Sequence, residues 1–248
     1  PQRAGAPSLA ARVGRGRGDD VTSSCKNPSQ LNFEIQSFEP LIAMSRAAQA
    51  TKNTITLKGS TEIVTEFFGY SINSILYQRG IYPPESFARV SKYGLQMLVT
   101  SDAGLQKYLQ QVLTQLSEWL YAGSVQKLVL VITSLETQTV LERWNFDIET
   151  DGSSVEKPDQ EHEKSEKDIM NEIRAIIRQI TASVTFLPLL QDACTFDLLV
   201  YTDNNIDVPR TWEESDPKYI NNQQEVRLRS FSTKVHKVDA MVAYKAED

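Results

Sequence analysis

The residues that most often carry out chemistry in proteins are few in this chain and lie far apart. The two cysteines, Cys25 and Cys194, and the two histidines, His162 and His236, form no zinc-ligand pattern. Distant cysteines, one of them in a segment with little predicted structure, favour free thiols in a reducing compartment over a disulfide. His162 lies in an acidic stretch and is expected to be a solvated surface residue. For His236 a pH-sensing role is the alternative to a plain structural one.

The sequence contains none of the glycine-rich or serine motifs that mark common enzyme sites. A Gly-x-x-x-x-Gly-Lys-Ser/Thr phosphate loop, a Gly-x-Gly-x-x-Gly fingerprint after a strand and a Gly-x-Ser-x-Gly elbow are all absent. No pair of carboxylates stands in an apolar setting that would separate their pKa values for acid and base catalysis. We therefore expect a binding module without a cofactor or a metal. An enzyme of unrecognised type is the alternative.

Two features indicate binding rather than catalysis. Trp212 stands in a polar stretch, DVPRTWEESDPKYINN, where a lone tryptophan is expected to anchor the loop or a ligand. Arg174 and Arg178 lie four residues apart on the polar side of a predicted helix, with Gln179 beside them. From the residues alone, a solvated helix surface is the simpler interpretation of these arginines.

The composition argues against two classes of function. The chain has 248 residues, of which 40% are hydrophobic and 23% charged, as in ordinary globular proteins. Its net charge of −6 gives no overall electrostatic case for nucleic acid as a partner. No run approaches the roughly 18 apolar residues that would span a bilayer.

The first fifty residues are predicted to form a disordered extension. The opening stretch PQRAGAPSLAARVGRGRGDD is rich in Arg, Gly and Ala and has no apolar period. An RNA-binding arm is the functional alternative to a flexible or non-native tail. The chain begins with Pro and its first methionine is Met44, so we expect residues 1–43 to be extraneous to the native protein. One domain is expected over residues 51–248.

Three helices are predicted from apolar residues that recur at intervals of three and four. They cover about residues 60–80, 102–123 and 165–184. The second helix has a good N-cap in Asp102. After the first helix, the pair Pro83-Pro84 should begin an irregular, rigid loop.

Strands are predicted between the helices and after them. Residues 125–132 and 140–148 are β-rich runs close enough to form an antiparallel hairpin, and residues 195–202 form another strand. The acidic residues 150–164 are expected to be an exposed loop. Because the helices segregate from hairpin-connected strands, the predicted class is α+β, with helices on one face of a mainly antiparallel sheet.

The last strand-like stretch, residues 225–244 (EVRLRSFSTKVHKVDAMVAY), has an inconsistent apolar parity. Val226 and Leu228 occupy even positions, Phe231 and Val235 odd ones, and the later valines even ones again. A shift of one residue sends every side chain of a strand to the other face. The stretch therefore contains bulges or turns, or it pairs in more than one register, and we favour the second interpretation.

Several long segments together resemble the HORMA domain family, and within it the spindle assembly checkpoint proteins. The matching stretches are ITLKGSTEIVTEFFGYSINSILYQRGIYP, SVQKLVLVI, VLERWNFDIE, IRQITASVTFLPLL, FDLLVYTD, WEES, and EVRLRSF followed by HKV and MVAYK. They cover about residues 46–246 and leave residues 1–43 unmatched. The resemblance implies three helices on a mainly antiparallel sheet, with a mobile C-terminal safety belt at about residues 203–248.

The resemblance further implies a non-enzymatic adaptor that switches between two conformers. In the open form the belt strands cover a sheet edge, and in the closed form they cross the sheet and lock over a partner peptide. That peptide is implied to add as a strand beside Phe196, Leu198 and Tyr201. The belt residues implied to hold it are Trp212, Val226, Leu228, Phe231, Val242 and Tyr244.

The partners implied by the resemblance are all proteins. One is the activator of the anaphase-promoting complex, whose capture inhibits that complex, and another is a coiled-coil kinetochore receptor that holds a closed copy. A dimer of open and closed copies and the comet adaptor would share one surface. That surface is implied to comprise Arg178, Gln179, Phe186 and Arg229. An AAA+ ATPase remodeller would pull on the N-terminal switch segment near Ile55 and Leu57.

The resemblance also implies a place in the cell and a point of regulation. The protein is expected in the nucleus and cytoplasm, and at the kinetochore and spindle in mitosis. Asp239 stands where family members often carry a serine, so phosphorylation at that position is excluded. The alternative within the family is the HORMA adaptor of translesion DNA synthesis.

Overall fold

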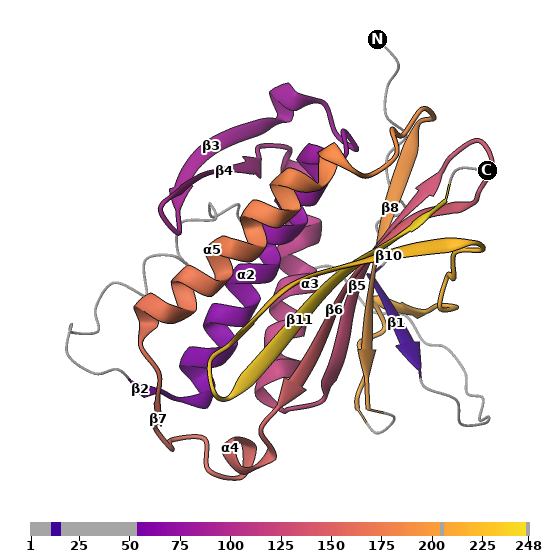
Figure 1. The fold of residues 1–248 in the computed structure, drawn as a ribbon. Coiled ribbons are helices and arrows are strands. Elements are labelled where there is room, and N and C mark those ends of the chain that lie inside the picture. Colours follow the sequence, from indigo (N-terminus) through magenta and orange to yellow (C-terminus); the bar gives the residue numbers. More distant parts are fainter. Residues whose placement is uncertain (1–10, 16–53, 204–205, 247–248) are drawn as a thin grey trace.

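A seven-stranded sheet forms the centre of the structure, which is a computed structural model describing residues 11–15, 54–203 and 206–246. In these residues the strand order is β10-β11-β6-β5-β8-β1-β9. Helices α2, α3 and α5 lie together against one face of the sheet (Figure 1). The expected α+β class, with three helices on a mainly antiparallel sheet, is confirmed.

Helix α2 (Leu57–Gln78) is the helix at the centre of the core. It begins a few residues earlier than the sequence predicted, because the Thr56 side chain caps it by accepting a hydrogen bond from the Gly59 N–H at 3.3 Å. The chain leaves the helix through Gly80, whose φ of +64° is a conformation that glycine adopts at little cost. Most of its apolar side chains are buried, among them Phe67 and Phe68, while Ile63 is half-buried.

Helices α3 (Ala103–Tyr121) and α5 (Glu166–Ala182) flank α2 as expected. Asp102 caps α3, its Oδ1 accepting from the Leu105 N–H at 2.8 Å. Ser165 occupies the N-cap position of α5, but its side chain makes no capping hydrogen bond. A 3₁₀ turn, η3 (Ser183–Thr185), extends α5 at its C-terminal end.

The predicted hairpin and the strand after α5 form the middle of the sheet. They are β5 (Val125–Ser134), β6 (Val140–Thr150) and β8 (Cys194–Thr202). Strand β5 pairs antiparallel with both β6 and β8. The hydrophobic residues of β5 and β8 are buried almost without interruption, as expected for strands at the centre of a sheet.

The prediction of an irregular loop after Pro83-Pro84 is wrong for the residues that follow the first turn. Only the 3₁₀ turn η2 (Pro84–Ser86) precedes an antiparallel hairpin of β3 (Phe87–Lys92) and β4 (Leu95–Thr100), which packs against α2. Tyr93 and Gly94 connect its strands with φ values of +53° and +67°. Two consecutive positive φ values give a turn whose twist matches that of the strands it joins, so the Tyr-Gly pair was the missed signal.

The acidic stretch at 150–164 is not a plain loop, and it pairs with part of the N-terminal switch segment. The stretch contains a short helix, α4 (Gly152–Glu156), and a strand, β7 (His162–Glu163), which pairs with β2 (Thr54–Ile55). Ile55 is therefore paired in a strand. Leu57 instead begins α2 and is buried, because the Thr56 cap starts the helix there.

The C-terminal stretch forms a hairpin of β10 (Gln223–Ser232) and β11 (His236–Lys245), and β11 pairs with β6. The pairing between the two strands shifts register between Arg227 and Ser230, and a turn follows at residues 233–235. A bulge changes which face later side chains occupy. The bulge and the turn explain the broken parity with a single pairing, so the favoured interpretation of two registers is not required.

A strand in the first fifty residues was not predicted from the sequence. Residues Ala11–Arg15 form β1, and β9 (Trp212–Glu214) lies outside it at the end of the sheet. The expectation of disorder is wrong for these residues because an open sheet edge supplies backbone hydrogen bonds without requiring an apolar pattern. The rest of residues 1–50, including Cys25 and Met44, lies outside the described residues. No helix in the described part of the chain is long and apolar enough to cross a bilayer.

Candidate functional site

The candidate site is the edge of β8, where β1 lies between β8 and β9. Strand β1 is parallel to both neighbours, whereas every other pairing in the described part of this sheet is antiparallel. Arg12 is in register with Leu199, and Arg15 with Thr202. On the other side, Ala11 is in register with Trp212. The site therefore holds a short extended segment by backbone pairing on both of its edges, the arrangement of β-augmentation.

The three residues predicted to line the peptide edge do not share one environment. Phe196 and Leu198 are buried on the helix side of the sheet, where the Phe196 ring lies 6.0 Å from that of Tyr108. Tyr201 is half-buried on the opposite face and is in register with Gly14 of β1. Phe196 and Leu198 precede the part of β8 that pairs with β1, and their contact with a partner peptide stays a prediction.

The inner side of the site is formed by the chain that follows β8. Ile206, Val208 and Trp212 pack against the core on the helix side of the sheet. The Trp212 ring lies 4.8 Å from the ring of Trp119 on α3, at an angle of 61°. An edge-on aromatic pair of this kind adds about 0.5–1.5 kcal/mol beyond burial. Trp212 thus anchors the start of β9, in agreement with the anchoring role predicted for it.

The outer side of the site is formed by residues 215–222, which cross the sheet from β9 to β10. Strands β9 and β10 lie at opposite ends of the seven-stranded sheet, so the connection between them must pass over a face of it. Lys218 Nζ lies 2.7 Å from Asp197 Oδ2 on β8. Further along, Tyr219 places its ring 5.4 Å from the guanidinium of Arg143 on β6. The crossing thus contacts β8 and β6 on the face of the sheet, while β9 pairs with the outer edge of β1.

The hairpin of β10 and β11 closes the opposite end of the sheet and is packed into the core. Phe231 is buried, and its ring lies 4.8 Å from that of Phe67 on α2. Val242 is buried opposite Trp144 of β6, while Val226 and Leu228 are half-buried against the same core. The Tyr244 hydroxyl donates to Gln224 Oε1 at 2.8 Å. These belt residues therefore lie at the sheet end farthest from β1 and do not contact it.

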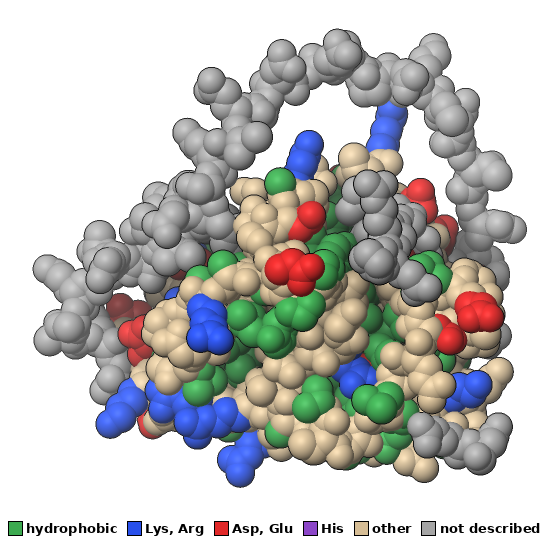
Figure 2. All heavy atoms as spheres, turned by 90° about the horizontal axis from the view of Figure 1, so that it is seen from above, with side chains coloured by type: hydrophobic (Ala, Val, Ile, Leu, Met, Phe, Trp, Pro, Cys, Tyr) green, Lys and Arg blue, Asp and Glu red, His purple; other side chains and the backbone are tan. Residues whose placement is uncertain are grey.

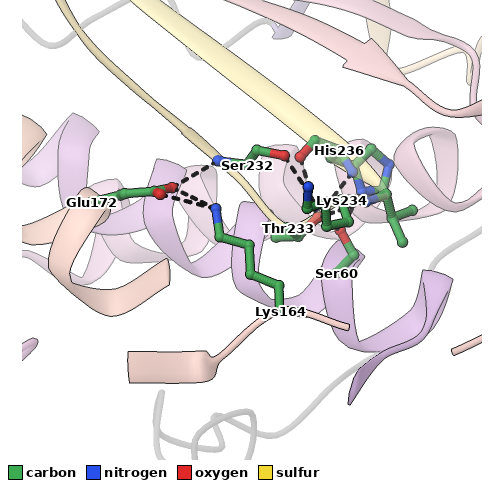
Figure 3. A network of polar contacts seen from close by, with 8 residues as sticks. Ser60, Lys164, Glu172, Ser232, Thr233, Lys234 and His236 are labelled. Atoms are coloured by element: carbon green, nitrogen blue, oxygen red, sulfur yellow. Dashed lines mark hydrogen bonds and ion pairs between the residues drawn. The ribbon is translucent and has the colours of Figure 1, made fainter. Parts of the chain in front are cut away.

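A buried polar cluster of Ser60, Thr233 and His236, named here the hairpin latch, fixes the turn of this hairpin to α2 (Figure 3). Ser60 Oγ lies 2.6 Å from His236 Nδ1 and 2.5 Å from Thr233 Oγ1. The other ring nitrogen, Nε2, lies 3.4 Å from the carbonyl oxygen of Leu120. A neutral imidazole with its proton on Nε2 satisfies both contacts, donating to Leu120 and accepting from Ser60.

Burial keeps the latch histidine neutral. Loss of hydration lowers the pKa of His236 from 6.5 to about 4, and the hydrogen bond to the Leu120 carbonyl only partly opposes this. The sequence placed His236 in a strand-rich tail but gave no sign of its partners, because Ser60 is 176 positions away. The latch is a buried tertiary contact that the sequence did not predict.

A second contact joins the same hairpin to α5. Glu172 Oε2 accepts a hydrogen bond from the Ser232 N–H at 3.1 Å, and Lys164 Nζ lies 2.9 Å from both Glu172 oxygens (Figure 3). Gln179 Oε1 accepts from the Arg229 N–H at 2.7 Å. Arg229 lies within the bulge of β10, so Gln179 satisfies a donor that the interrupted pairing leaves open.

The predicted dimer face lies on the solvent side of α5 and its continuation. Arg178 and Arg229 are exposed, and Gln179 joins α5 to β10 between them. Phe186 is 42% exposed, and nearby Leu189 is 82% exposed. Figure 2 views the end of the molecule where α5 terminates and shows hydrophobic side chains gathered there among polar ones. The use of this face for dimer formation stays a prediction.

The comparisons with known proteins agree with this geometry. The family model for the HORMA domain matches residues 60–236. The chain belongs to the HORMA domain family. Its relatives include mitotic spindle assembly checkpoint proteins MAD2A from Dictyostelium discoideum, 68% identical over 201 residues, and from Homo sapiens, 62% identical over 191 residues. These matches cover 81% and 77% of this chain, and 98% and 93% of the relatives.

The structural matches support the same membership. A chain in the crystal structure of the mitotic checkpoint complex is 46% identical, with a TM-score of 0.69 and 76% of this chain and 99% of that chain covered. HTP-2 of C. elegans, bound to a HIM-3 closure motif, shares the fold at 15% identity and a TM-score of 0.59, over 78% of this chain and 93% of that chain. The expected membership of the HORMA family and of its spindle checkpoint proteins is confirmed.

Proposed function

We propose that this protein is an adaptor of the spindle assembly checkpoint that captures partner peptides as strands at the edge of β8. The observation that carries the proposal is a strand, β1, paired on one side with β8 and on the other with β9. A peptide in that position gains main-chain hydrogen bonds on both sides. It cannot leave sideways without displacement of the belt, so its dissociation is slow.

The arrangement of the C-terminal hairpin supports the closed form of a switching protein. The hairpin of β10 and β11 is paired with β6, at the end of the sheet opposite the β8 edge. In the open form that we propose, the belt strands cover the β8 edge instead. Conversion between the two forms breaks the pairing of β11 with β6, the hairpin latch and the burial of Phe231. So many simultaneous losses predict a slow conversion without a catalyst.

The partners follow from the relatives. The match to a chain of the mitotic checkpoint complex supports capture of the activator of the anaphase-promoting complex as the inhibitory step. By the same family argument, a coiled-coil kinetochore receptor holds a closed copy, and the comet adaptor and a second copy use the face that includes Arg178 and Phe186. An AAA+ ATPase remodeller acts on the segment near Ile55. The proposed sites of action are the nucleus, the cytoplasm, and the mitotic kinetochore and spindle.

We further propose that the protein is non-enzymatic. It would form one domain over residues 51–248, with a belt from about residue 203. No group of three or more His, Cys, Asp or Glu side chains in the described residues could hold a metal ion. The translesion adaptor is less well supported, because the DNA polymerase zeta processivity subunit of Schizosaccharomyces pombe is 30% identical over 165 residues. This match covers 64% of this chain and 76% of that subunit.

The test uses a set of overlapping, fluorescein-labelled peptides from the activator of the anaphase-promoting complex. Anisotropy should show saturable capture of one peptide by the full chain, followed by very slow release after addition of unlabelled peptide. A chain ending at residue 234 lacks β11 and should lose the slow release, and a chain ending at residue 246 is the matched control. Equal retention by both truncations would refute the belt, and no capture by either the full chain or a chain lacking residues 1–15 would refute the proposed function.

A further inference from the structure

The strand held in the candidate site is part of this chain itself. Residues Ala11–Arg15 form β1, and residues 16–53 join them to β2 on the folded body. The pairing is not a marginal contact at one end of a strand. Four residues of β1 are in register with β8 and three with β9, and Arg12 and Val13 are paired on both sides.

Nothing in this pairing requires a special side chain. A parallel strand between two neighbours uses only its backbone N–H and C=O groups, so any extended segment without proline at the paired positions can occupy it. The segment Ala11–Arg15 contains no proline, so every residue in it, Gly14 included, has a backbone N–H that can pair. The chemistry of the site therefore does not distinguish its own N-terminal segment from a partner peptide by backbone bonds alone.

We propose that residues 11–15 are an internal occupant of the peptide-capture site, holding the belt closed and competing with partner peptides. This proposal rests on the proposed function, since it names the regulation of the same site. An occupant within the same chain acts at a local concentration independent of protein concentration, so it outcompetes a weak partner and yields to a strong one. A partner that binds the site must then displace β1, and the released N-terminal segment marks the loaded state.

The occupant is assigned to the same molecule and not to a second copy. The pairing of β1 with β8 and β9 is formed within one chain, and residues 16–53 are long enough to connect it, at about 3.3 Å per extended residue. Exchange of the segment between two copies would give a dimer whose amount rises with concentration. A constant monomer mass by light scattering across a 50-fold dilution is therefore expected, and concentration-dependent dimers that disappear with β1 would overturn the internal assignment.

The decisive variant is Val13→Pro in the full chain. Proline at position 13 removes one backbone donor in a strand paired on both sides and prevents regular pairing there. Val13→Ala keeps the donor and is the matched control. Two labelled probes are used with each protein. One is a peptide with the sequence of residues 6–20, APSLAARVGRGRGDD, and the other is the activator peptide that is captured in the anisotropy screen described under the proposed function.

The expected result is that Val13→Pro captures both probes at least 10-fold more readily than the wild type and Val13→Ala. In hydrogen exchange, those amides of residues 199–202 that point towards β1 and not towards β5 should be protected in the wild type, exposed in Val13→Pro, and protected again when the 6–20 peptide is added. Equal capture of the activator peptide by all three proteins, with no binding of the 6–20 peptide, would overturn this inference and leave the proposed function intact. Capture of neither probe by Val13→Pro would instead refute peptide capture at this site, and the inference with it.

Discussion

Acid should weaken the attachment of the C-terminal hairpin through His236. The ring is buried in the hairpin latch, where both nitrogens have partners that suit the neutral form. Loss of hydration lowers its pKa to about 4 from an ordinary 6.5. A lowered pKa in the folded state means that stability is complete above pH 6.5 and is lost as the pH falls from 6.5 towards 4. Over that range only the unfolded or released histidine binds the proton.

The magnitude follows from the two pKa values. At pH 5.5 an exposed histidine with a pKa of 6.5 is protonated about ten to one, while the buried ring stays almost entirely neutral. This difference favours the unfolded state by about 1.4 kcal/mol. At pH 4 the loss approaches its limit of about 3 kcal/mol. If the hairpin detaches before the rest of the domain unfolds, the same proton binding should accelerate release of a captured peptide by up to tenfold at pH 5.5.

Urea unfolding at pH 7.5, 6.5 and 5.5, followed by tryptophan fluorescence, measures the effect. The control is His236→Asn, which removes the titrating group while retaining an amide that can hydrogen-bond to Ser60. The variant will be less stable at every pH, so only the pH dependence is compared. The wild type should lose about 1.4 kcal/mol more than the variant between pH 7.5 and 5.5. The same pH dependence in both proteins would refute the assignment of the neutral, buried ring.

Three further predictions address the belt, the dimer face and the core. Trp212→Ala should speed release of a captured peptide about tenfold, because the ring contact with Trp119 is lost. Trp212→Phe should retain part of that contact and release the peptide more slowly than Trp212→Ala. Equal release rates in a chase experiment would contradict the anchoring role of Trp212. Arg178→Ala should abolish open–closed dimers in light scattering while peptide capture is unchanged, and persistence of the dimers would place that face elsewhere. Arg79→Met should cost about 3–5 kcal/mol in urea unfolding, because it removes the cation beside the buried carboxylate of Glu142, which keeps the hydrogen bond from Trp144. Adding Glu142→Gln should recover part of that loss, and a cost under about 1 kcal/mol for the single variant would refute the coupling.

Local patterns in the sequence were enough for most of the scaffold. The N-cap Asp102, the apolar stripe of α3 and the strand-like runs of β5 and β6 each depend on neighbours within one element, so periodicity predicted them. The hairpin of β3 and β4 was not predicted, because Pro83-Pro84 indicated a loop and the Tyr93-Gly94 pair is not one of the common hairpin-turn signals. The start of α2 was misplaced because the Thr56 cap was not recognised.

The functional site depended on tertiary structure to a greater degree. The resemblance to the HORMA family named the belt, and Trp212 stood out as an anchor, but neither specified where the belt lies. The inconsistent parity of residues 225–244 resulted from a bulge beside Arg229, which Gln179 of α5 stabilises from a distant part of the chain. A bulge of this kind is invisible in the sequence because its partner is set by packing.

By itself, the sequence determined the class of fold, the family, the three helices and the central strands, because each follows from local periodicity or from long matching segments. Only the tertiary structure decided which end of the sheet carries the C-terminal hairpin, how His236 meets Ser60, and what lies between β8 and β9. The reason is physical: backbone pairing at a sheet edge is nearly indifferent to side-chain identity, so the partner of an edge strand is chosen by topology and enclosure. The segment Ala11–Arg15 shows this most clearly, since no apolar pattern marks it and yet it is paired on both sides.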